Sequence, residues 1–238
     1  FIDLVIGTHN KEHLPKLLAQ AYFGKAKVVE VLSTQGNILE GAPKIRESHH
    51  KAWVNIMFGC DEFCTYCIVP YTRGKERSRA KEDILEEVRT LVQEGYQEIT
   101  LLGQNVNAYG KDLDGDYTFG NLLYDLDQTG IKRIRFTTSH PRDLDTRTMQ
   151  AMKECKSVMP HLHLPVQSGD DEILKKMNRK YTAETYLDKI RQLKQLIPDL
   201  SLTTDLIVGF PNETEEQFEH TLQLVQAADF EGAFTFIY

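Results

Sequence analysis

Short apolar runs alternate with amphipathic stretches from Ala52 to the end of the chain. The apolar runs predict six strands, at Trp53–Phe58, Glu98–Leu102, Arg133–Thr138, His161–Val166, Ser201–Val208 and Ala233–Tyr238. Apolar residues at helical spacing lie between them and predict helices at Lys81–Glu94, Asn121–Gln128, Leu144–Glu154, Asp171–Met177, Thr182–Ile197 and Glu213–Ala227. Strands that alternate with helices indicate βαβ units around a parallel sheet, either open or closed into a barrel.

The residues before this alternating region follow another pattern. Phe1–Gly7 and Lys27–Leu32 are short apolar runs that predict strands, and a helix is expected from Leu14 to Tyr22. A polar stretch without periodicity follows, which is typical of a linker. We therefore expect three parts: residues 1–40 as the tail of a smaller α/β domain, 41–51 as a linker, and 52–238 as a core domain that stops at its sixth strand.

Composition narrows the class of protein. The 238 residues are 41% hydrophobic and 26% charged, which excludes wholesale disorder. The net charge of −7 argues against a general phosphate-binding coat, so contact with nucleic acid needs a local patch or a partner domain. No apolar run approaches the roughly 20 residues that span a bilayer, and no export signal is visible. We expect a cytoplasmic protein that does not bind membranes.

Three of the four cysteines lie close together after the first strand of the alternating region. Cys60, Cys64 and Cys67 have the spacing C-x3-C-x2-C, while Cys155 lies in a predicted helix, where a small buried residue is expected. Three such close thiols predict a metal site in a reducing compartment rather than a disulfide framework.

The type of metal follows from the number of ligands. Structural zinc needs four ligands, so its fourth would have to be distant, and Cys155, His49, His50, His161 and His163 are candidates. An iron–sulfur cluster on three cysteines would keep one iron open to a ligand, which is a catalytic arrangement. The cysteine pattern favours the cluster, and a zinc-stapled RNA-binding module is the alternative from another class.

Polar residues directly after the predicted strands are further candidates, since chemistry in parallel α/β folds collects at the carboxyl ends of strands. Gln104 and Asn105 follow the second strand, and Ser139 and His140 follow the third, where a turn into a helix is the plainer interpretation. Gln167 and Ser168 follow the fourth strand, and Gly169 allows close backbone approach to a ligand.

A local basic stretch follows the cysteines. Arg73, Lys75, Arg77 and Arg79 occupy alternate positions, which point the same way if the stretch is extended. Such a face could hold nucleic-acid phosphates, although a solvated charged face is the alternative.

The cysteine spacing and several longer motifs together resemble the radical S-adenosylmethionine (radical SAM) methylthiotransferases. The motifs are GTHN (residues 7–10), KAWVNIMFGC (51–60), CIVPYTRGKERSR (67–79), GQNVN (103–107), HLPVQSG (163–169) and DLIVGFPNET (205–214). The likeness covers nearly the whole chain, and within the family it is greatest to the branch that modifies N6-isopentenyladenosine next to the anticodon. Sister branches act on threonylcarbamoyl-adenosine tRNA or on a ribosomal-protein aspartate, and they remain alternatives.

The resemblance implies a partial (βα)6 barrel and specific chemistry. Cys60, Cys64 and Cys67 are expected to hold a 4Fe-4S cluster whose open iron binds SAM. Reductive cleavage of SAM gives a 5′-deoxyadenosyl radical that abstracts hydrogen from C2 of the adenine, and a methylthio group is inserted there. The implied partners are tRNA and an electron donor such as flavodoxin or ferredoxin.

The same resemblance assigns SAM contacts. Gln104 and Asn105 lie where relatives meet the SAM amino group, and Arg179 could reach its carboxylate with a bidentate fork. Asp205 and Gly209 belong to a motif that resembles the adenine-binding segment, and Gln167 and Ser168 complete the predicted set.

Two family features have no counterpart in these residues. The family's N-terminal domain holds an auxiliary cluster with three further cysteines, whereas Cys155 is the one cysteine here outside the triplet. The basic RNA-binding TRAM domain is also absent. We therefore expect a second 4Fe-4S cluster only in a longer protein, and no complete sulfur insertion by these residues alone.

Overall fold

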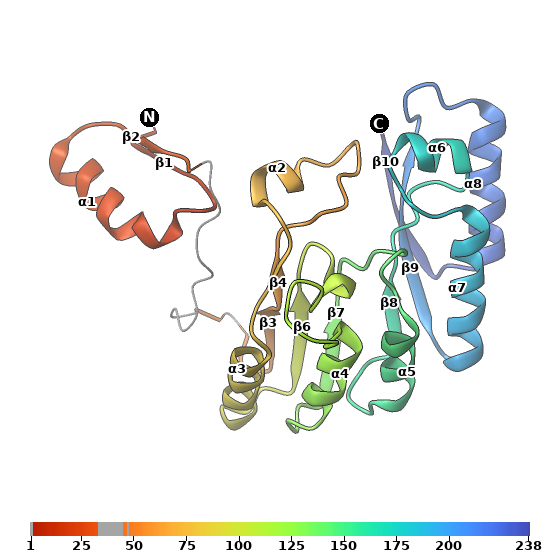
Figure 1. The fold of residues 1–238 in the computed structure, drawn as a ribbon, viewed down its shortest axis with the longest axis horizontal. Helices are drawn as coiled ribbons and strands as arrows, with labels where there is room; N and C mark the ends of the chain where they lie inside the picture. Colours follow the sequence, from red (N-terminus) through yellow and green to blue (C-terminus); the bar gives the residue numbers. More distant parts are fainter. Residues whose placement is uncertain (1, 33–44, 47) are drawn as a thin grey trace.

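The computed structural model describes residues 2–32, 45–46 and 48–238, and two three-stranded parallel sheets form its main body (Figure 1). The first has the order β3 (Lys51–Asn55), β6 (Glu98–Leu102), β7 (Arg133–Phe136), and the second the order β8 (His161–His163), β9 (Ser201–Val208), β10 (Gly232–Ile237). A parallel bridge between Ile134 and Val158 joins them. The six strands therefore follow one another in chain order without detected closure, as a partial (βα)6 barrel requires.

Helices cover one face of these strands (Figure 1). They are α3 (Lys81–Gln93), α4 (Phe119–Asp127), α5 (Thr146–Glu154), α7 (Ala183–Leu196) and α8 (Glu215–Ala228). The short α6 (Asp171–Lys176) lies at one end of the strands instead, where Ile173 packs in a small separate cluster with Met177 and Phe210. Thr182 and Thr214 form capping boxes at the starts of α7 and α8, and Asp145 caps α5. Local sequence thus sets where the helices begin.

The core lies between the strands and these helices. Alternate strand residues are buried there, among them Val54, Leu101, Ile134 and Leu202. The residues between them, such as Trp53, Thr100 and Asp205, lie on the opposite face of the sheets and remain partly or largely exposed. One face of the strands therefore builds the core, while the other is free for polar groups.

The predicted strand Trp53–Phe58 is divided in the structure, since β4 (Met57–Phe58) is separate from β3. Short elements next to the cysteines were not predicted: β5 (Arg77–Ser78) pairs antiparallel with β4, and α2 (Val69–Arg73) lies between the two strands in the chain. A short 3-10 helix, η2 (Val106–Ala108), follows β6. Another prediction needs correction: β8 ends at His163, since the chain reaches Pro165, which has no N–H for a strand ladder.

The first residues form a small separate βαβ unit (Figure 1). β1 (Leu4–Ile6) pairs in parallel with β2 (Val28–Glu30), and η1 (Lys11–His13) and α1 (Leu14–Gly24) connect them. In the predicted linker over 41–51, residues 41–44 and 47 lie outside the described residues, and β3 already starts at Lys51. The proposed domain limits remain a prediction. No helix among the described residues is long and apolar enough to cross a bilayer.

Candidate metal and cofactor site

The cysteines lie on the loop between β4 and α2, which we call the cysteine loop (residues 59–68). Cys60 is 8% exposed, Cys64 and Cys67 are half-buried, and none is in a disulfide. Burial raises the pKa of the Cys60 thiol to about 12, so a metal would have to displace its proton. The start of the loop is tied to the turn that follows α2 by the hydrogen bond from Cys60 N to Gly74 O, at 3.1 Å.

The spacing of the cysteine sulfurs bears on the kind of metal. In the described part of the chain, the one group of three His, Cys, Asp or Glu ligand atoms within 4.8 Å of one another is Glu62, His140 and Asp143. The three sulfurs do not meet that limit, whereas sulfurs on one zinc ion, each about 2.3 Å from it, would. Three free thiols on one loop have the chemistry to ligate an iron–sulfur cluster.

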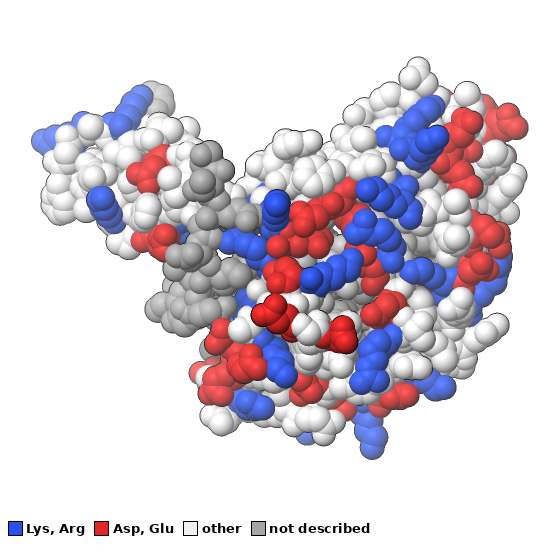
Figure 2. Space-filling view, viewed as in Figure 1, with Lys and Arg blue, Asp and Glu red and all other residues white. Residues whose placement is uncertain are grey.

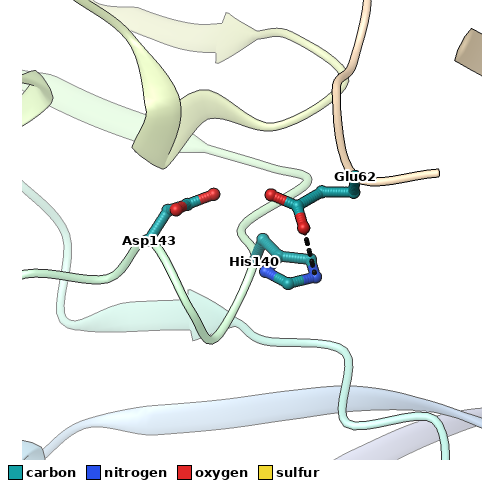
Figure 3. A group of neighbouring side chains, drawn as sticks. All are labelled: Glu62, His140 and Asp143. Carbon is teal, nitrogen blue, oxygen red and sulfur yellow. Dashed lines mark ion pairs between the residues drawn. The ribbon is translucent and has the colours of Figure 1, made fainter. Parts of the chain in front are cut away.

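The first half of the cysteine loop is fixed by side chains that follow β6 and β7. Gln104 accepts a hydrogen bond from Gly59 N at 2.6 Å. Glu62 is buried, forms an ion pair with Arg142 and lies 3.6 Å from His140 Nε2. Figure 3 shows the Glu62 carboxylate pointing to His140, with Asp143 on its other side. These contacts tie the loop to the carboxyl end of the first sheet.

Charges in this group are unevenly distributed. Burial raises the pKa of Glu62 to about 7, and a hydrogen bond with Asp143 adds to the effect. Burial opposes the charge of Asp143 as well, yet hydrogen bonds from Lys111, Arg142 and Asn105 hold its pKa well below the usual range. Burial, followed by the charge of Arg179, lowers the pKa of His140, which is therefore neutral.

Glu62, His140 and Asp143 have the residue types of a divalent-cation site. However, Arg142 and Lys111 already neutralise the two carboxyl groups, because both cations contact Asp143 and Arg142 also contacts Glu62. A metal ion would have to displace these side chains. The group is therefore a buried charge network that holds the loop.

The backbone of the middle of the cysteine loop, from Glu62 to Thr65, is held by the residues at the end of α6. Thr65 donates from its backbone to Met177 O at 3.1 Å and from its hydroxyl to Lys176 O at 3.0 Å. Asn178 donates from its amide to the carbonyls of Glu62 and Phe63. Next in the chain, Arg179 is buried and its Nη1 lies 3.6 Å from Cys64 Sγ.

The predicted cofactor residues divide into two groups. Gln167 has a φ of +72°, and its buried Oε1 has no hydrogen-bond partner in the described structure. Strain together with an unpaired polar atom is typical of a ligand site. Asp205 lies 3.3 Å from His163 Nε2 on the free face of the sheet, and Gly209 has a φ of +71° with open space where a Cβ would stand. These three remain candidates.

Other predicted side chains are occupied within the protein. Ser168 is fully buried and its hydroxyl lies 3.4 Å from Thr221 Oγ1 of α8. Asn105 donates to Asp143, while Gln104 accepts from Gly59, as described above. Asn105 Oδ1 has no partner among the described residues, so Asn105 still has one free acceptor.

The basic stretch is not one extended face. Arg73 ends α2, and Gly74 with a φ of +74° turns the chain before β5. Arg73 and Lys75 are exposed and Arg77 is half-buried. Arg79 is only 4% exposed and pairs with Glu87 at 2.9 Å, so the expectation of an RNA-facing side chain at this position is wrong.

Sequence reasoning missed the role of Glu62, Arg142 and Asp143. Glu62 lies between two cysteines, where a charged loop residue is ordinarily solvated. The sequence pattern gives no sign that its carboxyl turns inward to the loop after β7. His140 was identified as a candidate, with a turn into a helix as the plainer interpretation.

The sequence and the fold match one large class. The sequence profile of the radical SAM superfamily matches residues 54–225, so the chain belongs to this superfamily. A radical SAM methyltransferase, TsrM from Kitasatospora setae with cobalamin and a 4Fe-4S cluster bound, aligns with a TM-score of 0.65 at 16% identity, over 78% of this chain and 36% of its own. Coproporphyrinogen III oxidase (HemN) from Escherichia coli, a radical SAM enzyme, aligns with a TM-score of 0.54 at 16% identity, over 80% of this chain and 44% of its own.

Curated relatives are much more similar in sequence. The tRNA-2-methylthio-N(6)-dimethylallyladenosine synthase of Staphylococcus epidermidis is 60% identical over 238 residues, all of this chain and 46% of the relative. The protein of that name from Bacillus subtilis (strain 168) is 58% identical over 239 residues, 47% of its length. The chain thus spans about half the length of the curated relatives it matches.

Proposed function

We propose that this chain is the radical SAM part of a tRNA methylthiotransferase, which adds a methylthio group to C2 of N6-isopentenyladenosine next to the anticodon. The observation that supports it most is the loop with three free cysteines at the carboxyl end of parallel strands, within a chain 60% identical to proteins of that activity. Because the relatives are about twice as long, the complete reaction belongs to a longer protein.

Cys60, Cys64 and Cys67 are the residues that would hold the 4Fe-4S cluster. When bound, such a cluster with an open iron supplies the electron for reductive cleavage of SAM into methionine and a 5′-deoxyadenosyl radical. The chain's own contribution is to fix the three thiolates and to place polar groups beside them. A second cluster belongs to the longer protein.

SAM would lie against the strand ends next to the cysteine loop. Gln167 offers an unpaired buried amide oxygen, and Gly209 leaves space at the end of β9 for close approach of a ring. Asp205 offers a carboxylate on the free face, kept in place by His163. These three residues bind and orient the cofactor in our proposal.

An electron donor would approach the exposed side of the cysteine loop. Phe63, Ile68 and Tyr71 are 47%, 66% and 74% exposed there, and such apolar side chains suit a protein partner such as flavodoxin or ferredoxin. For tRNA, Arg73 and Lys75 remain the candidates. Lys, Arg, Asp and Glu interleave over the face in Figure 2, so this face offers no continuous basic field, and other parts of a longer protein would add phosphate contacts. We place the reaction in the cytoplasm.

The decisive experiment uses oxygen-free reconstitution of the chain with iron and sulfide. The parent is expected to bind about four iron atoms and to cleave SAM reductively. Cys64→Ala should lose both, whereas Cys155→Ala, which changes a buried cysteine outside the loop, should keep both. Binding of one zinc and no iron, with RNA binding independent of SAM, would instead support the zinc-stapled module.

The substrate needs a separate measurement with the full-length protein. Mass spectrometry of nucleosides from tRNA incubated with it should detect a methylthio group on N6-isopentenyladenosine. Modification of threonylcarbamoyl-adenosine, or of a ribosomal-protein aspartate, would assign the chain to a sister branch.

A further inference from the structure

Arg179 is a buried cation without a carboxylate partner among the residues that the structure describes. Its side chain donates from Nη2 to Pro165 O at 2.6 Å and from Nε to Tyr181 Oη at 2.7 Å. Both acceptors are neutral. A buried guanidinium is costly unless a negative charge lies close to it, so the remaining donor should face an anion.

The remaining donor, Nη1, faces the cysteine loop. It lies 3.6 Å from Cys64 Sγ and 3.5 Å from Tyr66 Oη. The Cys64 thiol becomes a thiolate when it ligates a metal. The sulfur that Arg179 contacts then carries the negative charge that the buried guanidinium needs. The two buried charges would compensate each other only in the metal-loaded protein.

The surrounding residues set Arg179 in this position. Arg179 N donates to Leu174 O at the end of α6, and Asn178, with a φ of +59°, holds two carbonyls of the cysteine loop. One turn therefore both fastens the loop and directs a cation at one of its cysteines. The guanidinium group of Arg179 is planar, and its Nε and Nη2 atoms are already hydrogen-bonded, so the position of Nη1 is fixed.

We propose that Arg179 is a positioning residue that donates a hydrogen bond to the Cys64 thiolate and makes the cluster easier to reduce. This inference rests on the proposed function, because it needs a cluster on the three cysteines. Reduction adds a negative charge to the cluster, and a fixed cation beside a ligand sulfur stabilises that state. Hydrogen bonds to cluster sulfurs and local charge are known determinants of such potentials.

The test is a redox titration of the reconstituted chain without SAM, followed by its visible absorbance. The chain has four cysteines, three of them in the loop, so one cluster is titrated. Arg179→Gln is expected to lower the equilibrium constant for one-electron reduction about tenfold, a shift of about 59 mV to more negative potential. Arg179→Lys keeps the charge but not the fork and should shift less, in the same direction.

The matched control is Lys180→Gln, which removes one positive charge from the neighbouring, exposed residue. Its potential should equal the parent's. If Arg179→Gln holds as much iron as the parent and has the same reduction potential, the inference is overturned. If that variant has lost SAM affinity while its potential is unchanged, Arg179 is a SAM ligand instead. If Arg179→Gln cannot hold a cluster, the Arg179→Lys variant provides the test. A reduction potential of Arg179→Lys equal to that of the parent would also overturn the inference. Failure of the parent to bind iron would contradict the proposed function itself.

Discussion

The cysteine loop is held by two different kinds of contact. Charged side chains after β7 fix the first half, through Glu62 with Arg142 and His140. Residues at the end of α6 fix the loop backbone from Glu62 to Thr65, through hydrogen bonds with Thr65 and from the Asn178 side chain. The charged contacts therefore depend on protonation and on ion pairing, while the contacts with the loop backbone depend on backbone conformation. Substitutions in the two sets should differ in kind as well as in size.

The largest effect is expected from Asp143→Ala. Asp143 accepts from Asn105, Lys111 and Arg142, and its loss leaves these donors without their shared buried acceptor. We expect the free energy of unfolding to fall by about 4 kcal/mol, as for other broken buried ion pairs. Urea unfolding would measure it. Asp114→Ala, which changes an exposed acidic residue, is the control, and an equal loss in both variants would contradict a network role.

Glu62 allows the protonation of the first half to be tested. Its pKa is 4.5 as a free group and about 7 in the folded chain, so the folded state binds the proton more tightly. Between these values, raising the pH favours the unfolded state. Protonated Glu62 therefore stabilises the folded state by about 3 kcal/mol below pH 4.5, and this stabilisation is lost as the pH rises through 7.

The measurement compares unfolding of the metal-free chain at pH 5 and pH 8. Glu62→Gln lacks the titrating group, so its change in the free energy of unfolding between the two pH values should differ from that of the parent by about 3 kcal/mol. An identical pH dependence in both would mean that Glu62 is ionised throughout.

The smallest effect is expected in the contacts with the loop backbone, at Asn178. Asn178→Gly removes two hydrogen bonds to the loop but tolerates the φ of +59°, and we expect a loss of about 1 kcal/mol. Asn178→Ala adds left-handed strain and should lose about 2 kcal/mol. Asn212→Ala, at a φ of +63° outside the loop contacts, measures the strain alone. Denaturant unfolding gives all three values, which should not depend on pH between 5 and 8.

Much of the fold could be predicted because it depends on local pattern. Glu98–Leu102 and Ser201–Val208 are strands with the predicted limits, since their burial alternates as their apolar residues do. The family and the partial barrel are likewise confirmed. The roles of individual site residues stay predictions.

What could not be predicted depends on contacts between distant residues. Arg79 has the same local pattern as Arg73 and Lys75, and only the position of Glu87 on α3 draws it inside. The inward turn of Glu62 similarly depends on Arg142, 80 positions away in the numbering. Charged residues give the same local signal whether they are solvated or paired.

Gly59 limits how the cysteine loop can be redesigned. A Cβ at this position would stand 2.0 Å from Lys75 O and 2.6 Å from Gly74 O, so every other residue would force the start of the loop away from the turn that follows α2. Libraries that aim to change donor recognition are therefore best built at the exposed Phe63, Ile68 and Tyr71, with Gly59 and the Gly74–Lys75 turn left untouched.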